Sequence, residues 1–524
     1  MLNLNELTNK NPDELINIIQ SLQETLLKNQ KQLQNKDILI ACLNDTIALM
    51  KHEKFASRSE KYIDNSLQGR LFNEAESSEK TADIEEAEQE ILIPSHTRKK
   101  TGRKPLPRDL PREQITHDLP EHEKTCGCGC ELSHIGDERT EQLDIIPAKI
   151  KVIEHIQLKY ACKSCKETIK LAEKTKQPIP KSFATAGLLA YVLTQKFQFH
   201  LPLYRQEQMF KAIGVDLLRG TLSNWVIQCG KLLQPLVNFM EDEVLGYDIA
   251  YADESTVQVL KEENKTAQSK SYMWCYGGGP PDRFCYIYHY HPSREYKIPK
   301  LFFADYKGFL HCDGYQAYDA LVKENADVTL VGCWYHARRK FADAAKVSKN
   351  PGISAWFIKQ VARLAKIEKN IKDEKQNAEQ VHPYRLENAK PIIDKIKLKL
   401  DEHQNKTSTS SLLGKAIHYM LNQWPKLQNY FEDGRLEISN NRMERAIKPF
   451  ATGRKNWLFA NSVEGAKAAA NIFSLIETCK AHQINPYDWL RAILQKIPYC
   501  ETVEQYEALL PFNFIKQVDN QVGE

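Results

Sequence analysis

The chain has 524 residues, of which 42% are hydrophobic and 27% are charged. This length predicts roughly three or four domains rather than a single core, and the lack of any run of about eighteen apolar residues argues against a membrane-spanning helix. The formal net charge of +4 neither requires nor excludes a nucleic-acid partner, so the position of the basic residues is more informative than their sum. Thirteen cysteines behind an N-terminus that does not read as a secretory signal predict reduced thiols in the cytosol, with any cluster serving as a metal site.

Residues 1–52 carry a heptad pattern from residue 13 onward. The two seam positions are apolar except at Asn29 and Lys36, and the apolar members are Leu15, Ile19, Leu22, Leu26, Leu33, Ile40, Leu43, Ile47 and Met50. A narrow apolar stripe with polar flanks predicts a coiled coil through which copies of the chain self-associate. The alternative is an amphipathic helix that packs on its own domain.

Residues 53–115 read as a linker whose charge changes sign. The acidic segment "EAESSEKTADIEEAEQE" (74–90) predicts a solvated or disordered stretch. The segment "HTRKKTGRKPLPRDLPREQ" (96–114) is basic, and its prolines exclude a regular helix. A basic arm of this kind suits phosphate contact, and the candidate DNA-binding residues are Arg98, Lys99, Lys100, Arg103 and Lys104.

Residues 116–170 contain two groups of cysteines that predict a small zinc module. Cys162 and Cys165 form a C-x2-C pair, and the first group is Cys126, Cys128 and Cys130. Two thiolate pairs can hold one tetrahedral zinc ion, but the C-x-C-x-C spacing leaves open which cysteines of the first group bind it. The strand-like segment "AKIKVIEHIQLKYAC" between them favours a zinc-ribbon hairpin, and a set of free thiols is the alternative.

Residues 180–240 read as helices. Gly214 and Gly220 interrupt the helical pattern before "TLSNWVIQCGKLL". This arrangement is compatible with a helix-turn-helix that binds DNA and equally with a plain helical connector.

Residues 245–460 alternate between strand-like and helical segments, which predicts a mixed α/β core with a helical insertion. "GYDIAYADESTVQVL" and the two segments after it read as an antiparallel meander, and "GFLHCDGYQAYDALV" and "VTLVGCWYHARRKF" read as strand–helix units. This order is that of a ribonuclease-H-like α/β domain, in which the first and fourth strands are neighbours. Asp253 on the first strand and Asp313 at the end of the fourth would then meet at one edge, while strand alternation points Glu254 to the opposite face. We expect a helical insertion at about 345–430 and a helical C-terminal region at 461–524.

The stretch "EISNNRMERAIKPFATGRKNWLF" (437–459) sets one central acid, Glu444, among basic residues. If residues 439–450 are helical, Ser439 can cap the helix, and Asn440, Asn441, Glu444, Arg445 and Lys448 share a face. A carboxylate alone among cations is an ion-paired residue. Facing two aspartates, it becomes the third ligand of a Mg²⁺ or Mn²⁺ site that can serve phosphodiester chemistry.

Basic and aromatic residues around these acids are further DNA-binding candidates. Those near the second strand–helix unit are His336, Arg338 and Arg339, and those near Glu444 are Arg442, Arg445, Lys448, Arg454, Lys455 and Trp457. The basic residues would hold phosphates, and the indole could stack on an unpaired base. A solvated basic helix and core packing of the tryptophan are the alternatives.

Several long motifs together resemble the large transposase of the insertion-sequence sixty-six family, of the DDE class. They include "FASRSEK", "ADES", "HCDGYQAYD", "VGCWYHARRKF", "SNNRMERAIKPFATGRKNWLF" and "SLIETCKAHQINPYDWL". The resemblance implies that Asp253, Asp313 and Glu444 are the catalytic triad and that a zinc-binding region lies at Cys126–Cys165. It also implies binding to the element's terminal inverted repeats, strand cleavage and joining of the 3′-hydroxyl ends to target DNA. Small accessory proteins and a bacterial cytosolic, nucleoid-associated location follow from the same resemblance.

Two other functions remain compatible with the residues. A nuclease of the same fold would use the same three acids to cut DNA without rejoining it. A DNA-binding protein without catalysis would keep the fold but would have no need of the intact acids.

Overall fold

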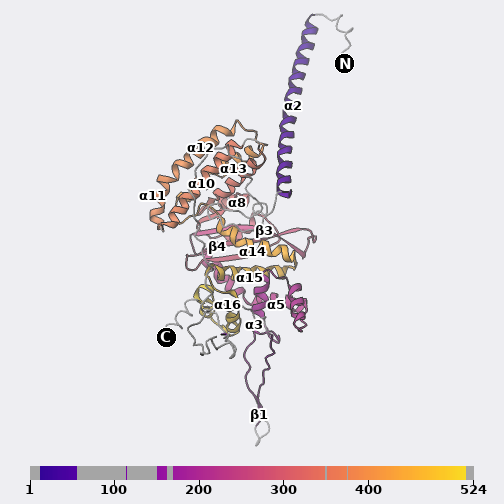
Figure 1. The fold of residues 1–524 in the computed structure, drawn as a ribbon, viewed down its shortest axis with the longest axis vertical. Helices are drawn as coiled ribbons and strands as arrows, with labels where there is room; N and C mark the ends of the chain where they lie inside the picture. The colour runs from indigo at the N-terminus through magenta and orange to yellow at the C-terminus, as the bar shows by residue number, and fades with distance from the viewer. Residues whose placement is uncertain are drawn as a thin grey trace, which may run out of the picture. The chain divides into compact units, whose positions relative to one another are not determined.

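The computed structural model of the protein describes residues 12–55, 114, 150–161, 169–348, 351–374 and 376–514. By its internal contacts the chain divides into two compact units, Met1–Ala82 with Thr175–Glu524, and Asp83–Lys174. The larger unit combines many helices with one mixed sheet, which agrees with the predicted α+β class (Figure 1). None of the helices in the described ranges combines the length and the apolarity that a bilayer crossing requires.

The heptad pattern lies on one long helix, α2 (Pro12–Phe55). Its seam faces outward, and Leu26 and Leu33 are each 59% exposed. Toward its C-terminal end α2 contacts α9 (Trp334–Val347) and α13 (Leu412–Gln428). The predicted helix is therefore present, and most of its apolar stripe remains accessible to a partner.

The smaller unit contributes one described hairpin, formed by β1 (Lys159–Ala161) and β2 (Ile169–Leu171). The two strands are antiparallel and pair Tyr160 with Lys170. The longer predicted strand is only partly correct, since residues 150–158 have no regular structure. The candidate zinc ligands Cys126, Cys128, Cys130, Cys162 and Cys165 lie outside the described residues, as does the basic arm at 98–104.

The segment predicted to be helical at 180–240 forms four helices. Thr185 begins the first of them, because its side chain accepts a hydrogen bond from the Leu188 amide. The second and third helices pack against each other, as a helix-turn-helix requires, but that assignment stays a prediction. The helices are α3 (Ala186–Phe197), α4 (Leu203–Ala212), α5 (Arg219–Leu232) and α6 (Gln234–Leu245).

The central sheet has the strand order β5-β4-β3-β6-β7, with a short strand, β8, pairing with the end of β3. β4 is antiparallel to β3, whereas β6 is parallel to it, so the first and fourth strands of the core are adjacent, as predicted. Gly308 begins β6 with φ of +133°, where a Cβ atom would collide with the Asp248 backbone. The strands are β3 (Ile249–Lys261), β4 (Lys270–Gly278), β5 (Cys285–His291), β6 (Gly308–Cys312), β7 (Val328–Gly332) and β8 (Ala460–Ser462).

Helices cover the sheet, and one of them also covers its edge strand β5 (Figure 1). On the edge strand β5, the backbone amides of Tyr286 and Tyr288 donate to Thr478 Oγ1 (3.0 Å) and Ser474 Oγ (2.8 Å) of α15 (Val463–Ala481). These hydroxyls satisfy backbone donors that an open edge would offer to another chain. α14 (Asn441–Trp457) packs across β3 and β4, and the remaining helices of the core and C-terminal region are α7 (Lys297–Phe302), α8 (Gln316–Glu324), α16 (Pro486–Lys496) and α17 (Val503–Glu507).

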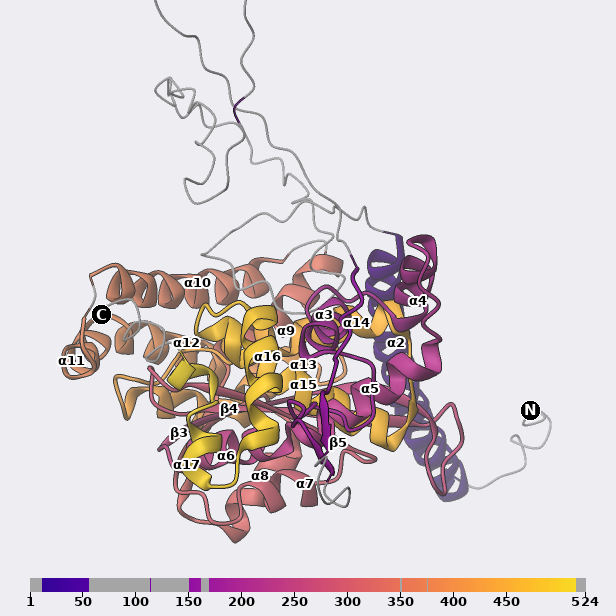
Figure 2. The ribbon, with the colours of Figure 1, turned by 90° about the horizontal axis from the view of Figure 1, so that it is seen from below.

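The segment between α9 and α14 is helical, as the sequence predicts. Its helices pack on one another and on α9, and they lie together in both views (Figures 1 and 2). Arg385 joins this bundle to the chain that leads into α14, because its guanidinium donates to Glu368 and to the Leu436 carbonyl. The helices are α10 (Gly352–Asp373), α11 (Ala378–Asn388), α12 (Lys390–Gln404) and α13.

Candidate active site

Asp253 lies on β3, directly after the buried run Ile249–Ala252. Its Oδ1 accepts a hydrogen bond from the Glu254 amide at 2.8 Å. Burial raises the pKa of Asp253 well above its usual value, and the negative charges of Glu254, Asp313 and Glu444 raise it further. Negative charges from two other segments, those of Asp313 and Glu444, therefore act on Asp253.

Asp313 follows the last residue of β6. Since β6 runs parallel to β3, the topology brings Asp313 to the part of the sheet where Asp253 lies. Its Oδ1 accepts the Tyr315 amide at 2.9 Å, which fixes the carboxylate at the turn before α8. Burial raises its pKa, while that hydrogen bond and the charges of Arg294 and Lys426 offset part of the rise.

Glu444 lies in the first turn of α14 and is only 3% exposed. Asn440, just before the helix, donates from Nδ2 to the Ala252 carbonyl at 2.9 Å. The predicted cap is wrong: the helix begins at Asn441, and the residue at the capping position is Asn440 rather than Ser439. Asn440 makes no side-chain cap hydrogen bond, and its Nδ2 group joins α14 to β3.

The predicted shared face of this helix is also wrong. Asn440 and Glu444 are buried, whereas Arg445 and Lys448 are exposed. The helix therefore directs its acid into the protein and these two cations outward. The spacing of i and i+4 residues alone could not give this separation, because it depends on which side of α14 packs on the sheet.

Glu254 has partners of its own. Its Oε1 accepts from Arg294 Nε at 2.8 Å, and its Oε2 accepts from the Tyr318 hydroxyl at 3.4 Å. Burial and the charge of Asp313 raise its pKa to about 7 despite Arg294. Glu254 has its own hydrogen-bond partners, but its charge reaches both aspartates, so the expectation that strand alternation keeps it apart from them stays a prediction.

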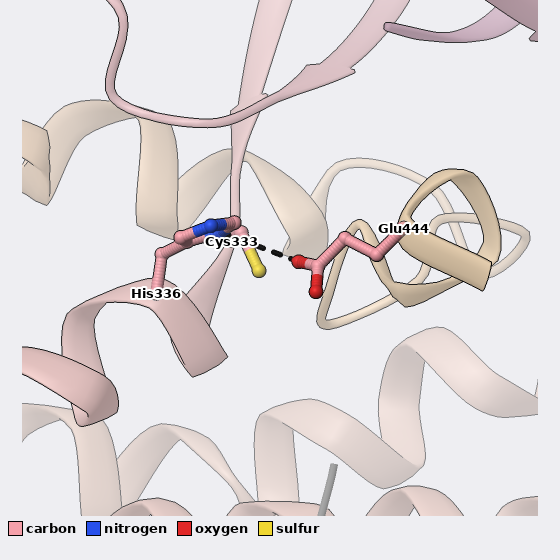
Figure 3. A group of neighbouring side chains, drawn as sticks. All are labelled: Cys333, His336 and Glu444. Carbon is pink, nitrogen blue, oxygen red and sulfur yellow. Dashed lines mark ion pairs between the residues drawn. The ribbon is translucent and has the colours of Figure 1, made fainter. Parts of the chain in front are cut away.

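The structure adds a residue that sequence reasoning missed. Cys333, at the start of α9, has its Sγ within 4.8 Å of ligand atoms of His336 and Glu444 (Figure 3). His336 Nδ1 lies 3.5 Å from Glu444 Oε1. Burial, with Arg339 and Lys340 nearby, lowers the pKa of His336 to about 3, so the ring is neutral at pH 7. The C-x2-H spacing of Cys333 and His336 was the available signal.

The acids are of the type that a hard divalent cation takes as ligands. Burial and, after it, the negative charges of Glu254, Asp313 and Glu444 raise the pKa of Asp253, although the ligand atoms of Asp253, Asp313 and Glu444 do not all lie within 4.8 Å of one another. A cation near these acids would relieve the repulsion. Oxygen donors of this kind suit Mg²⁺ or Mn²⁺. Asp253, Asp313 and Glu444 would be its ligands.

The candidate DNA-binding residues fall into two groups, those whose side chains contact other parts of the protein and those that are exposed or half-buried. Arg442 donates from Nε to Glu437 at 3.1 Å, and Arg454 bonds Thr256 Oγ1 of β3 at 2.8 Å. Trp457 packs on Phe450, with the ring centroids 5.6 Å apart. Of these contacts, the one made by Arg454 attaches α14 to β3, whereas those of Arg442 and Trp457 lie within α14 and the segment just before it. His336, Arg338 and Arg339 are half-buried on α9, and Lys455 is exposed like Arg445 and Lys448.

Comparison with known proteins extends these observations to nearly the whole chain. Residues 181–468 match the model described as "Transposase IS66 family", and residues 474–512 match the "IS66 C-terminal element". Residues 123–166 match the "zinc-finger binding domain of transposase IS66", and residues 42–115 match the "Transposase C of IS166 homeodomain".

Two curated relatives come from Sinorhizobium fredii. The uncharacterized protein y4jD is 32% identical over 426 residues, which cover 78% of this chain and 81% of the relative. The uncharacterized protein y4hP is 32% identical over 446 residues, which cover 80% of this chain and 78% of the relative. With a zinc-finger domain and a transposase domain that imply DNA transposase activity with DNA binding, the chain belongs to the IS66 transposase family.

Proposed function

We propose that this protein binds the terminal inverted repeats of its own insertion sequence, cleaves DNA strands there and joins the 3′-hydroxyl ends to target DNA. The observation that carries the proposal is that Asp253 is buried where the negative charges of Glu254, Asp313 and Glu444 all act on it, so that its pKa is raised. A fold that buries three carboxylates together incurs repulsion that only a cation or a proton relieves. Because the acids come from β3, the end of β6 and α14, this arrangement is a product of the tertiary fold.

The sheet supports a ribonuclease-H-like core as the scaffold. β3 has an antiparallel neighbour on one side and the parallel strand β6 on the other. When bound by Asp253, Asp313 and Glu444, two Mg²⁺ or Mn²⁺ ions would activate the attacking oxygen and stabilise the leaving oxygen of a phosphodiester. The chain's own part is to hold the three carboxylates in a fixed relation and to bind the DNA beside them.

Exposed cations support the DNA-binding part of the proposal. Arg445 and Lys448 lie on the outer side of the helix that carries Glu444, where they would bind phosphates and set the register of the strand. Arg338, Arg339 and Lys455 would extend this surface, whereas the neutral ring of His336 would not contribute charge to it. We propose that the basic arm at 98–104 and a helix-turn-helix of α4 and α5 bind the terminal repeats.

The remaining parts would assemble the complex. The accessible seam of α2 would pair copies of the chain, and Cys126, Cys128, Cys130, Cys162 and Cys165 would supply the ligands of a structural zinc ion. Accessory proteins of the same element would join the complex on DNA in the bacterial cytosol, at the nucleoid.

The test is Mg²⁺-dependent cleavage of a labelled duplex carrying the element's terminal repeat. The wild-type chain is compared with Glu444→Gln, with accessory proteins added where needed. The matched control is Glu464→Gln, the same change at an exposed glutamate in the first turn of α15. We expect Glu444→Gln to lose cleavage and keep DNA binding, and Glu464→Gln to keep both.

Each other result has a definite meaning. Cleavage without strand-transfer products would favour the nuclease. DNA binding without cleavage by any of the three proteins would favour the non-catalytic protein. If Glu444→Gln cuts as well as wild type, Glu444 is not part of the site.

A further inference from the structure

Three side chains with metal-ligating atoms meet where α9 begins. Ligand atoms of Cys333, His336 and Glu444 all lie within 4.8 Å of one another. Figure 3 shows His336 and Glu444 facing each other across the thiol of Cys333. Within the described residues this is the one group of three His, Cys, Asp or Glu side chains so close together. Asp253 and Asp313 are not members of it, although Glu444 links it to them.

The chemistry of this group differs from that of the acid cluster. A thiol and an imidazole are poor ligands for Mg²⁺, which takes hard oxygen donors. Together with one carboxylate they form a set that suits a borderline-soft ion such as Zn²⁺. Glu444 is therefore the common member of two donor sets of different hardness.

The fold fixes these donors before any ion arrives. Cys333 precedes α9 directly, and His336 lies in the first turn of that helix. The backbone amide of Asn440 donates a hydrogen bond to Cys333 Sγ at 3.3 Å. The backbone amide of Trp334 donates one to the Ile438 carbonyl at 3.1 Å. These two bonds join the start of α9 to the residues before α14, and so hold Cys333 and His336 beside Glu444.

We propose that Cys333, His336 and Glu444 form a second metal site, for a borderline-soft divalent ion such as Zn²⁺, and that an ion bound there inhibits DNA cleavage. The inhibition rests on the proposed function, because the ion would hold Glu444 away from Asp253 and Asp313. The metal site itself does not depend on that function.

The ligand atoms of Cys333, His336 and Glu444 need to move only a little to surround a zinc ion. Bonds of about 2.0–2.3 Å to a tetrahedral zinc ion place ligand atoms roughly 3.3–3.8 Å apart. The separation of 3.5 Å between His336 Nδ1 and Glu444 Oε1 already lies in that range. Binding replaces the S–H bond of Cys333 by a metal–sulfur bond, and the proton leaves to solvent. A water molecule would complete the four ligands.

The test uses Co²⁺ as the probe, because its bond to a thiolate gives a charge-transfer absorption. Full-length wild type, Cys333→Ser, His336→Ala and Cys229→Ser are titrated with Co²⁺ after metal removal. Cys229 is a buried cysteine of α5 and is not part of the proposed donor set. Cysteines 126–165 contribute equally to all four proteins, so difference spectra isolate the contribution of Cys333.

We expect Cys333→Ser to lose the absorption of one cobalt–sulfur bond, and Cys229→Ser to keep the wild-type spectrum. His336→Ala should weaken this binding step by more than the roughly ten- to hundredfold that residues beyond the ligands typically cost. Circular dichroism checks folding, and if Cys333→Ser is misfolded, the His336→Ala titration decides. Wild-type spectra and affinity in the folded variants would overturn the site.

The inhibition is measured as the ratio of Mg²⁺-dependent cleavage rates with and without added Zn²⁺. We expect a loss of about tenfold or more in wild type and a smaller loss in His336→Ala. An equal loss in both proteins would overturn the inhibition. If wild type does not cleave at all, the proposed function and the inhibition that depends on it fail, and the cobalt titration still decides the metal site.

Discussion

The side-chain amide of Asn440 donates a hydrogen bond to the backbone carbonyl of Ala252, across 2.9 Å. Ala252 immediately precedes Asp253, and Asn440 immediately precedes the helix that carries Glu444. The bond therefore connects the supports of two candidate metal ligands that are far apart in the sequence. Both partners are buried, so no water can replace either of them easily.

Replacing Asn440 by alanine should reduce cleavage more than it reduces stability. The change leaves a buried carbonyl without its donor, which costs about 1–3 kcal/mol of unfolding free energy. It also frees α14 to shift against β3, so Glu444 loses its position relative to Asp253. Chemical denaturation measures the first effect, and Mg²⁺-dependent cleavage at a temperature where the variant is folded measures the second.

A matched control exists in Asn471→Ala. Asn471 is also buried and donates from Nδ2 to a backbone carbonyl, that of Gly230, at 2.9 Å. It joins α15 to α5, away from the acids. This variant should lose similar stability and keep its cleavage rate. Equal losses of cleavage in the two variants would mean that Asn440 acts only through global stability.

The stability of the metal-free chain should fall as the pH rises from about 4.5 to about 7. Glu254 has its pKa raised from 4.5 to about 7, so in this window the folded chain binds a proton that the unfolded chain does not. Stability then decreases with pH, by roughly 1.4 kcal/mol per pKa unit, or about 3 kcal/mol at most. Thermal melts across this range, in chelator, measure the slope.

Glu254→Gln should flatten that slope, because an amide does not titrate. Glu464→Gln should leave it as in wild type. If Glu254→Gln keeps the full slope, another group is responsible, and Asp253 with its raised pKa is the next to test by Asp253→Asn.

Adding Mg²⁺ should stabilise the folded wild-type chain. An ion that binds only the folded state adds about 2.7 kcal/mol at a concentration one hundred times its Kd. Asp253→Asn and Asp313→Asn should lose this effect, since each removes a ligand. Asp216→Asn, which changes an exposed aspartate between α4 and α5, should respond like wild type. An unchanged response in the first two variants would remove these aspartates from the metal site.

Local patterns predicted the frame of the site well. The alternation after Gly246 and the two strand–helix units predicted the strand order of a ribonuclease-H-like domain, in which the first and fourth strands are neighbours. The sheet does pair the strand that carries Asp253 with the strand that leads to Asp313. The helix of Glu444 was readable from its spacing. What local patterns could not give is which groups the fold brings together over long separations. The sequence predicted only that Asn440 follows the capping residue Ser439. In the fold its side chain donates a hydrogen bond to a strand nearly two hundred residues away.

The same limit explains the basic residues and Cys333. In the sequence Arg442, Arg445 and Arg454 look alike. In the fold, the guanidinium of Arg442 lies over the Tyr251 ring and Arg454 bonds Thr256, while Arg445 stays exposed. Cys333 can be recognised as a candidate metal ligand only in the fold, where α14 brings Glu444 beside it. Residues whose roles depend on a distant partner are therefore the ones that a single sequence conceals.

The seam of α2 offers the last prediction, which concerns assembly. Leu26 and Leu33 are seam residues, each 59% exposed, and burying such a side chain contributes about 1.5–3 kcal/mol. Leu26→Glu with Leu33→Glu should therefore weaken self-association by at least about a hundredfold. Sedimentation equilibrium of the full-length chain measures the change. Leu27→Glu is the control, because Leu27 is 56% exposed on the same helix but lies outside the seam. Equal weakening by the control, or none from the double substitution, would show that copies of the chain do not pair through this face.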